Sequence, residues 1–158
     1  MTTGDSSVLP AEATTLVENF VGVWDVEGEL DVVGESKAPI SGVWTYREVA
    51  DGIGVSGHLA TTIEGVGTIE EAELIGYDIV GRRLHMFSMN ALAVRDHVGD
   101  WESDDRLKVT YRETADGTDA SEEISIRFER PGLIHAKVVE FASGSVVVRT
   151  HLDLTRRP

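Results

Sequence analysis

One stretch decides the fold of this chain: Phe20-Val21-Gly22-Val23-Trp24-Asp25-Val26-Glu27-Gly28-Glu29-Leu30. Within it Trp24 and Val26 alternate with acidic residues, which is the two-residue period of a half-buried strand. Before it, apolar residues recur every three or four positions between 11 and 20, and Pro10 stands at the first turn. That spacing predicts one short amphipathic helix over 10–20, too short to be stable alone, so we expect it to dock on an end of the sheet.

The strand period continues to the end of the chain. Turn signals rich in glycine and aspartate, such as Asp116-Gly117 and Ser143-Gly144, separate the runs, because these residues tolerate the backbone of tight turns. After the first strand we expect further strands at about Ile40–Val49, Ile53–Ile63, Thr68–Ile79, Arg83–Met89, Ala93–Gly99, Arg106–Glu113, Ser121–Arg130, Leu133–Phe141 and Val146–Thr155.

These strands are joined by short connections without helices, so neighbours must pair antiparallel. A meander of eight to ten such strands closes most simply into an up-and-down β-barrel, and closure removes exposed edges. The alternative is a two-sheet sandwich, whose crossings usually need longer connections. The prediction is an all-β chain with one domain over 1–158: a disordered lead-in over 1–9, a helix over 10–20 and a barrel over 21–155.

Composition narrows the classes of function. The formal net charge is −14, from 28 acidic and 14 basic residues, so we expect neither a nucleic-acid nor a membrane partner. The chain has no cysteine, which excludes disulfides and thiolate chemistry. No secretory signal is recognisable, and a cytoplasmic location is expected. A homodimer is the default for its assembly.

Several short motifs resemble one known group of proteins. The Gly22-Val23-Trp24 opening of the first strand after a short helix resembles the calycin barrels. A larger ordered set is similar to a narrower family: the run from Gly22 to Gly28 (Gly-x-Trp-x-Val-x-Gly), Ser41-Gly42 with Arg47, the Asp51-Gly52 turn, Ile75-Gly76-Tyr77-Asp78 and the Leu152–Arg156 stretch. The chain is similar in particular to a largely uncharacterised bacterial family of lipocalin-like domains. The resemblance implies a barrel with a central cavity, without an agreed substrate.

The resemblance also implies roles for some residues. Trp24 would lie at the closed end of the barrel, with Arg156 or Arg157 over its ring as a cation–π lid. Arg47 and Asp78 match family positions, which favours a buried ion pair between strands over a catalytic one.

Strand parity sorts the five histidines. His58, His97 and His151 alternate with apolar residues and are expected to face solvent. His85 shares its parity with Phe87 and Met89, and His135 shares its parity with Leu133 and Phe141. Both are expected on the inner face, either as core histidines with a polar partner or as cavity groups acting as a base or ligand contact. Neither of the common metal-binding histidine spacings, H-x-H and H-E-x-x-H, occurs, so no metal or other cofactor is expected.

The resulting hypothesis is a barrel that binds a small, mostly apolar molecule. Trp44 and Tyr46 share one face of their strand and form either a core layer or a pocket wall. Arg47 or Arg95 would meet a carboxylate or enolate on the ligand. The predicted cavity lining is Trp44, Tyr46, Arg47, His85, Phe87, Met89, Arg95 and His135. The alternatives are an isomerase, cyclase or lyase using the same cavity, or a filled barrel that serves in assembly; the sequence contains no motif that names a reaction.

Overall fold

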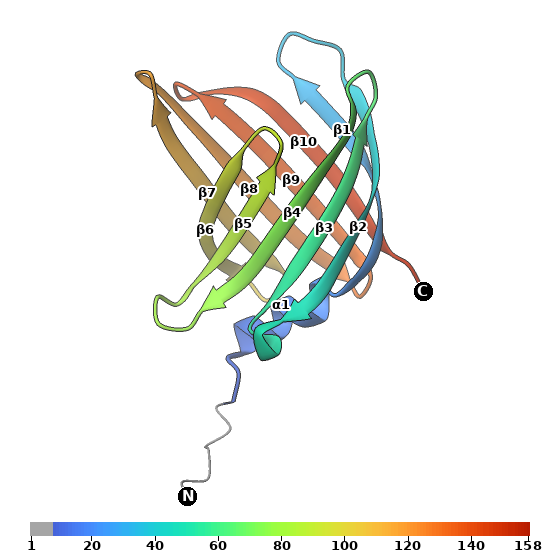
Figure 1. Cartoon of the computed structure of the whole chain (residues 1–158), viewed down its shortest axis with the longest axis vertical. Helices are drawn as coiled ribbons and strands as arrows, with labels where there is room; N and C mark the ends of the chain where they lie inside the picture. The colour runs from blue at the N-terminus through green and yellow to red at the C-terminus, as the bar shows by residue number, and fades with distance from the viewer. Residues whose placement is uncertain (1–7) are drawn as a thin grey trace, which may run out of the picture.

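The computed structural model describes residues 8–158 (Figure 1). Residues 1–7 of the predicted lead-in lie outside the described residues, and residues 8–10 have no regular secondary structure. The elements are α1 (Ala11–Phe20), β1 (Gly22–Val32), β2 (Ala38–Val49), the 3₁₀ turn η1 (Ala50–Gly52), β3 (Gly54–Ile63), β4 (Gly67–Asp78), β5 (Arg83–Asn90), β6 (Val94–Ser103), β7 (Arg106–Ala115), β8 (Thr118–Arg130), β9 (Leu133–Ala142) and β10 (Ser145–Arg156).

The strands form one closed antiparallel barrel. Each strand pairs with the next along the chain, and β1 pairs with β10 to complete the circle. This closing seam is long, running from Trp24 opposite Arg156 to Val32 opposite Val148. The predicted all-β, up-and-down, lipocalin-like barrel with one short helix is confirmed, with ten strands in the described residues.

Helix α1 covers one end of the barrel (Figure 1). It buries Ala13, Leu16 and Phe20 against the core, so the helical spacing of these apolar residues is what docks it. The opposite end carries the β1–β2, β3–β4, β5–β6, β7–β8 and β9–β10 hairpins. Within residues 8–158, no helix has both the length and the apolar character needed to cross a membrane.

Trp24 ties the helix, the first strand and the last strand together. Its side chain is fully buried, and its indole Nε1 donates a hydrogen bond of 2.8 Å to the Phe20 carbonyl at the end of α1. The Arg156 guanidinium lies 4.7 Å from the centre of the indole ring and donates to the carbonyl of Asn19. The predicted cation–π lid is therefore present and is made by Arg156, whereas Arg157 pairs with Asp25.

Candidate functional site

A cavity of about 250 Å³ lies inside the barrel, between the helix and the hairpin end. Phe20 of α1 lines it at the helix side, and Asn90 and Ala93, next to the β5–β6 hairpin, line it at the other end. Most of its wall is aromatic or aliphatic: Phe20, Trp44, Tyr46, Leu59, Met86, Ala93, Ile124, Ile126, Ile134, Ala136, Val138, Leu152 and Leu154. A mostly apolar interior void with a few polar groups is the usual form of a small-molecule site.

The polar wall of this cavity is rich in carboxyl groups. β4 contributes Glu71 and Glu73, β8 contributes Glu122, and β9 contributes Glu140. Arg95 of β6 is the basic side chain in the lining, and the wall is completed by Ser88 and Asn90 of β5. Buried charges are costly unless paired, so the partners of these groups decide what the cavity can hold.

Glu122 is the centre of a buried ion cluster. Its Oε2 accepts a hydrogen bond of 2.7 Å from Nη1 of Arg95, and its Oε1 lies 2.5 Å from Nε2 of His97. Glu122 is 8% exposed and His97 is 1% exposed, so water screens this cluster poorly. Tyr111 packs beside it, with its ring centre 5.7 Å from the Arg95 guanidinium carbon.

The geometry fixes the number of protons shared by His97 and Glu122. Nδ1 of His97 lies 3.2 Å from the Met86 carbonyl, which can only accept, so Nδ1 must carry a proton. The contact between Nε2 and Glu122 then needs a second proton, held either by the imidazole or by the carboxyl. In both cases Arg95, His97 and Glu122 together carry one net positive charge.

Within residues 8–158, no cationic side chain donates a hydrogen bond to Glu71, Glu73 or Glu140. Glu73 accepts a hydrogen bond of 2.6 Å from the Tyr46 hydroxyl, and Glu71 accepts one of 2.7 Å from the Asn90 amide. Burial raises the pKa of all three carboxyl groups, and the pKa of Glu73 reaches about 7 because desolvation outweighs the Tyr46 hydrogen bond. Glu73 can therefore gain or lose a proton near neutral pH.

The carboxyl groups are not arranged around a metal. Among residues 8–158, no group of three or more His, Cys, Asp or Glu side chains is placed to hold a metal ion. The carboxyl groups instead come from strands on different sides of the barrel and surround a void large enough for an organic molecule.

Three of the predicted lining residues line the cavity: Trp44, Tyr46 and Arg95. Trp44 donates its Nε1 hydrogen bond to Thr61 Oγ1 at 2.9 Å, which leaves the ring face toward the void. The prediction that His97 faces solvent is wrong. The parity of β6 placed Arg95 and His97 on the same face correctly, but that face points inward because Glu122 offers it a buried partner.

His85, Phe87 and Met89 do not reach the cavity. Phe87 is 41% exposed and Met89 is 49% exposed, and His85 pairs outside the barrel with Asp96. The inward residues of β5 are Leu84, Met86 and Ser88. The expectation was wrong because β5 has apolar residues on both faces, with Leu84 and Met86 inside and Phe87 and Met89 outside.

His135 and Arg47 also lie on the outside. His135 is held between Glu129 and Asp153, and its Nδ1 lies 2.5 Å from Asp153 Oδ1. These two hydrogen bonds raise the pKa of His135. Arg47 lines a shallow outer depression with His58 and is exposed, so the expected buried pair with Asp78 does not form. Asp78 instead accepts from the backbone N–H groups of Val80 and Gly81.

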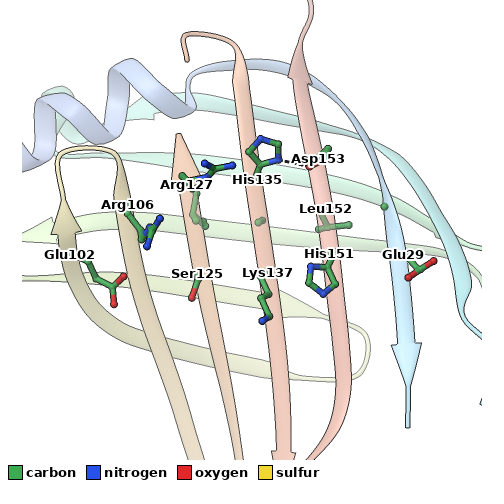
Figure 2. Close-up of a pocket in the computed structure, with 13 residues that line it drawn as sticks. Glu29, Glu102, Arg106, Ser125, Arg127, His135, Lys137, His151, Leu152 and Asp153 are labelled. Atoms are coloured by element: carbon green, nitrogen blue, oxygen red, sulfur yellow. Dashed lines mark hydrogen bonds and ion pairs between the residues drawn. The ribbon is translucent and has the colours of Figure 1, made fainter. Parts of the chain in front are cut away.

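Figure 2 shows the outer groove in which His135 lies. His135 and Lys137 follow one another along β9, with Arg127 on β8 on one side and Asp153 and His151 on β10 on the other. The groove encloses about 650 Å³ but is bordered by exposed polar side chains such as Lys137 and His151. The interior cavity combines burial, apolar surface and charge, so it is the candidate site.

Sequence reasoning missed the four cavity glutamates, although a signal was present. Glu71 and Glu73 have the same parity as Ile75 and Tyr77, which are buried in the barrel. Glu122 has the parity of Ile124, Ile126 and Phe128. A charged residue in phase with a buried apolar face is the pattern of a polar group in a cavity.

Comparison with known proteins supports the fold alone. The structure is similar to that of the S-type phycobiliprotein lyase CPES from Guillardia theta, with a TM-score of 0.60 and 14% sequence identity over 90% of each chain. No family model and no curated protein matches the chain. The lipocalin-like barrel is thus shared with a solved structure, while the site must be judged on its own residues.

Proposed function

We propose that this protein binds a small, mostly apolar molecule in the central cavity of its barrel. The observation that carries the proposal is the void of about 250 Å³ that runs between Phe20 and the β5–β6 hairpin, lined by aromatic and aliphatic side chains. A sequence selected only for a stable barrel would fill this space, because an empty cavity costs stability in proportion to its volume. The size suits a compact ligand, since typical ligand pockets start at about 300 Å³.

A neutral aromatic alcohol, 2-phenylethanol, tests this proposal by isothermal titration calorimetry. We expect it to bind the wild-type protein and to lose about tenfold or more in affinity in Ala136→Leu, because Ala136 is buried on the cavity wall and the added carbons occupy the void. The matched control is Ala72→Leu, which makes the same change on the exposed face of β4.

Native mass spectrometry of the freshly purified protein supplies an independent readout. A mass excess that disappears on denaturation, and that Ala136→Leu lacks, would identify a ligand carried from the cell. The proposal is contradicted if the wild-type protein binds neither 2-phenylethanol nor its amine analogue 2-phenylethylamine, or if 2-phenylethanol binds Ala136→Leu as tightly as Ala72→Leu.

We also propose that the chain belongs to the bacterial lipocalin-like family that its motifs resemble. The motif positions have matching structural roles here: Trp24 is the buried anchor of α1, and Arg156 of the last strand covers it. Gly28 is required by close packing, because a Cβ there would lie 2.0 Å from the His151 carbonyl oxygen. The activity of the phycobiliprotein lyase is not transferred to this chain, because a similarity at 14% sequence identity supports a shared fold alone.

One observation favours an enzyme as the second candidate. Glu73 combines a pKa of about 7 with a hydrogen bond from Tyr46 inside an apolar cavity, which is the environment of a general base. Such a base would serve an isomerase or a lyase that removes a proton from carbon.

The generic substrate 5-nitrobenzisoxazole tests this chemistry. A base removes the ring C–H proton, the N–O bond breaks, and the resulting cyanophenolate absorbs visible light. We expect a rate that increases through pH 7 as Glu73 ionises, and at least a tenfold loss in Glu73→Gln but not in the outward-facing control Glu70→Gln. Equal rates in these two variants would remove Glu73 as a base.

A further inference from the structure

The charges that line the cavity do not balance. The Arg95–His97–Glu122 cluster carries one net positive charge by the proton count above. The cavity holds three further carboxyl groups. Glu71 accepts a hydrogen bond from Asn90 and Glu73 accepts one from Tyr46, whereas Glu140 has no hydrogen-bonding partner in the described residues. With all three ionised, the cavity carries two uncompensated negative charges.

Arg95 is already paired with a carboxylate inside the barrel. Its Nη1 donates to Glu122 and its guanidinium lies near the Tyr111 ring, and its charge offsets only part of the burial that raises the pKa of Glu71 and Glu140. An incoming carboxylate would therefore share Arg95 with Glu122 and be repelled by the other cavity glutamates. This geometry disfavours acids, including the enolates and carboxylates that an inward arginine would otherwise suggest.

Two further features of the cavity suit a cation. The rings of Trp44, Tyr46 and Phe20 all line the void, and aromatic faces attract a cation that has left water. The glutamates also stand too far apart for a metal, since no three acidic or histidine side chains in the described part of the chain are grouped to hold one. A larger, organic cation with an apolar body can contact both the aromatic and the carboxyl wall.

We infer that the ligand of this cavity is a small amphipathic amine, bound as its ammonium ion between the glutamates of β4 and β9 with its apolar part toward Phe20. This inference rests on the proposed function and specifies the chemical class of the ligand. Binding releases a proton near neutral pH, because the ammonium favours ionised Glu73 over its protonated form. The groups that face Glu73 and set this response are Tyr46, Glu71, His97 and Glu122.

Three probes of nearly equal shape test the inference: 2-phenylethylamine, 2-phenylethanol and 3-phenylpropionate. We expect the amine to bind about tenfold or more tightly than the alcohol at pH 8, with the acid the weakest. The affinity for the amine should increase from pH 6 to pH 8, and calorimetry in buffers of different ionisation enthalpy should detect the released proton. The affinity for the alcohol should change little over this range.

Glu140→Gln removes a negative charge from the cavity and leaves the shape of the side chain almost unchanged. We expect it to weaken the amine about tenfold while leaving the affinity for 2-phenylethanol within about twofold. The matched control is Glu123→Gln, which removes a carboxylate from the outer face of β8 and should change neither affinity. Circular dichroism of each variant verifies that it is folded.

The outcomes separate this inference from the proposed function. If the alcohol binds wild type and is blocked by Ala136→Leu, but the amine binds no more tightly than the alcohol, then the cavity binds ligands and the inference about charge is wrong. If the acid binds most tightly, the charge assignment is reversed and the inference is equally wrong. If none of the three probes binds, the proposed function and the inference are both overturned.

Discussion

Glu122→Ala is expected to lower the free energy of unfolding by about 3–5 kcal/mol. The reason is the loss of a shared acceptor: Glu122 is the partner of both Arg95 and His97, and His97 is almost completely buried. Removing the carboxyl leaves a guanidinium and an imidazole with an unfilled space between them. Urea unfolding at pH 7, followed by circular dichroism, measures the loss.

The neighbouring residue on β8 is a matched control for this prediction. Glu123 faces outward and pairs with Lys108, with side chains 39% and 36% exposed. An exposed ion pair contributes about 0–1 kcal/mol, so Glu123→Ala should change stability little. Glu122→Gln should cost less than Glu122→Ala, because an amide can accept from Arg95 and donate to a neutral His97. Equal losses in Glu122→Ala and Glu123→Ala would show that the buried cluster contributes no more than a surface pair.

The fold was predictable because local and long-range signals agree. The Asp116-Gly117 and Ser143-Gly144 pairs both adopt positive φ, as the two central residues of the favoured hairpin turn require. Short turns of this kind force consecutive strands to pair, and a closed barrel follows from enough such strands. The change from helical to strand period at Phe20 likewise placed the end of the helix at its observed residue, while its start lies at Ala11, one residue after the predicted one.

The site was only partly predictable, because sequence parity shows which residues share a face but not which face points inward. On β9 the set of His135 and Lys137 alternates with Ile134 and Ala136, and the outward lysine was the better indicator of the exposed face. On β5 the charged marker is Arg83 at the first residue of the strand, on the exposed face of Phe87 and Met89. Met86 faces inward because it pairs with the buried Ile75 of β4. This contact joins two strands, so the sequence of β5 alone does not show it.

A second assumption also failed, namely that the inner face of a barrel is apolar. Here the interior also holds charged side chains, because Glu122 offers a partner to Arg95 and His97. A charged residue in phase with apolar ones is costly in a solid core but is acceptable beside a cavity where its partner lies on another strand. Such a partner cannot be recognised from either strand alone, since Arg95 lies on β6 and Glu122 on β8, with β7 between them.

The stability of the protein should decrease by about 3 kcal/mol between pH 4.5 and pH 8 through Glu73 alone. Its pKa is about 7 in the folded barrel, above its usual value of 4.5, because burial disfavours the carboxylate. Below pH 4.5 both the folded and unfolded chains hold the proton, so there is no effect. As the pH rises, the unfolded chain loses its proton first, which favours unfolding until the folded form also ionises above pH 7. The magnitude follows from about 1.4 kcal/mol for each unit of difference in pKa.

Glu71 and Glu140 also have a raised pKa, so they too should lower the stability as the pH rises. The Glu73→Gln variant separates the contribution of Glu73 from theirs. The amide keeps the shape and can still accept from Tyr46, but it cannot ionise. We expect the variant to become more stable than wild type by about 2–3 kcal/mol at pH 8, relative to any difference between them at pH 4.5. Urea unfolding at both values measures this change, and Glu70→Gln, exposed on the same strand, should leave it near zero. A difference between Glu73→Gln and wild type that is the same at both pH values would mean that Glu73 ionises at its ordinary pKa. No proton would then be exchanged by Glu73 near neutral pH, and the proton release that we expect when an amine binds would not occur.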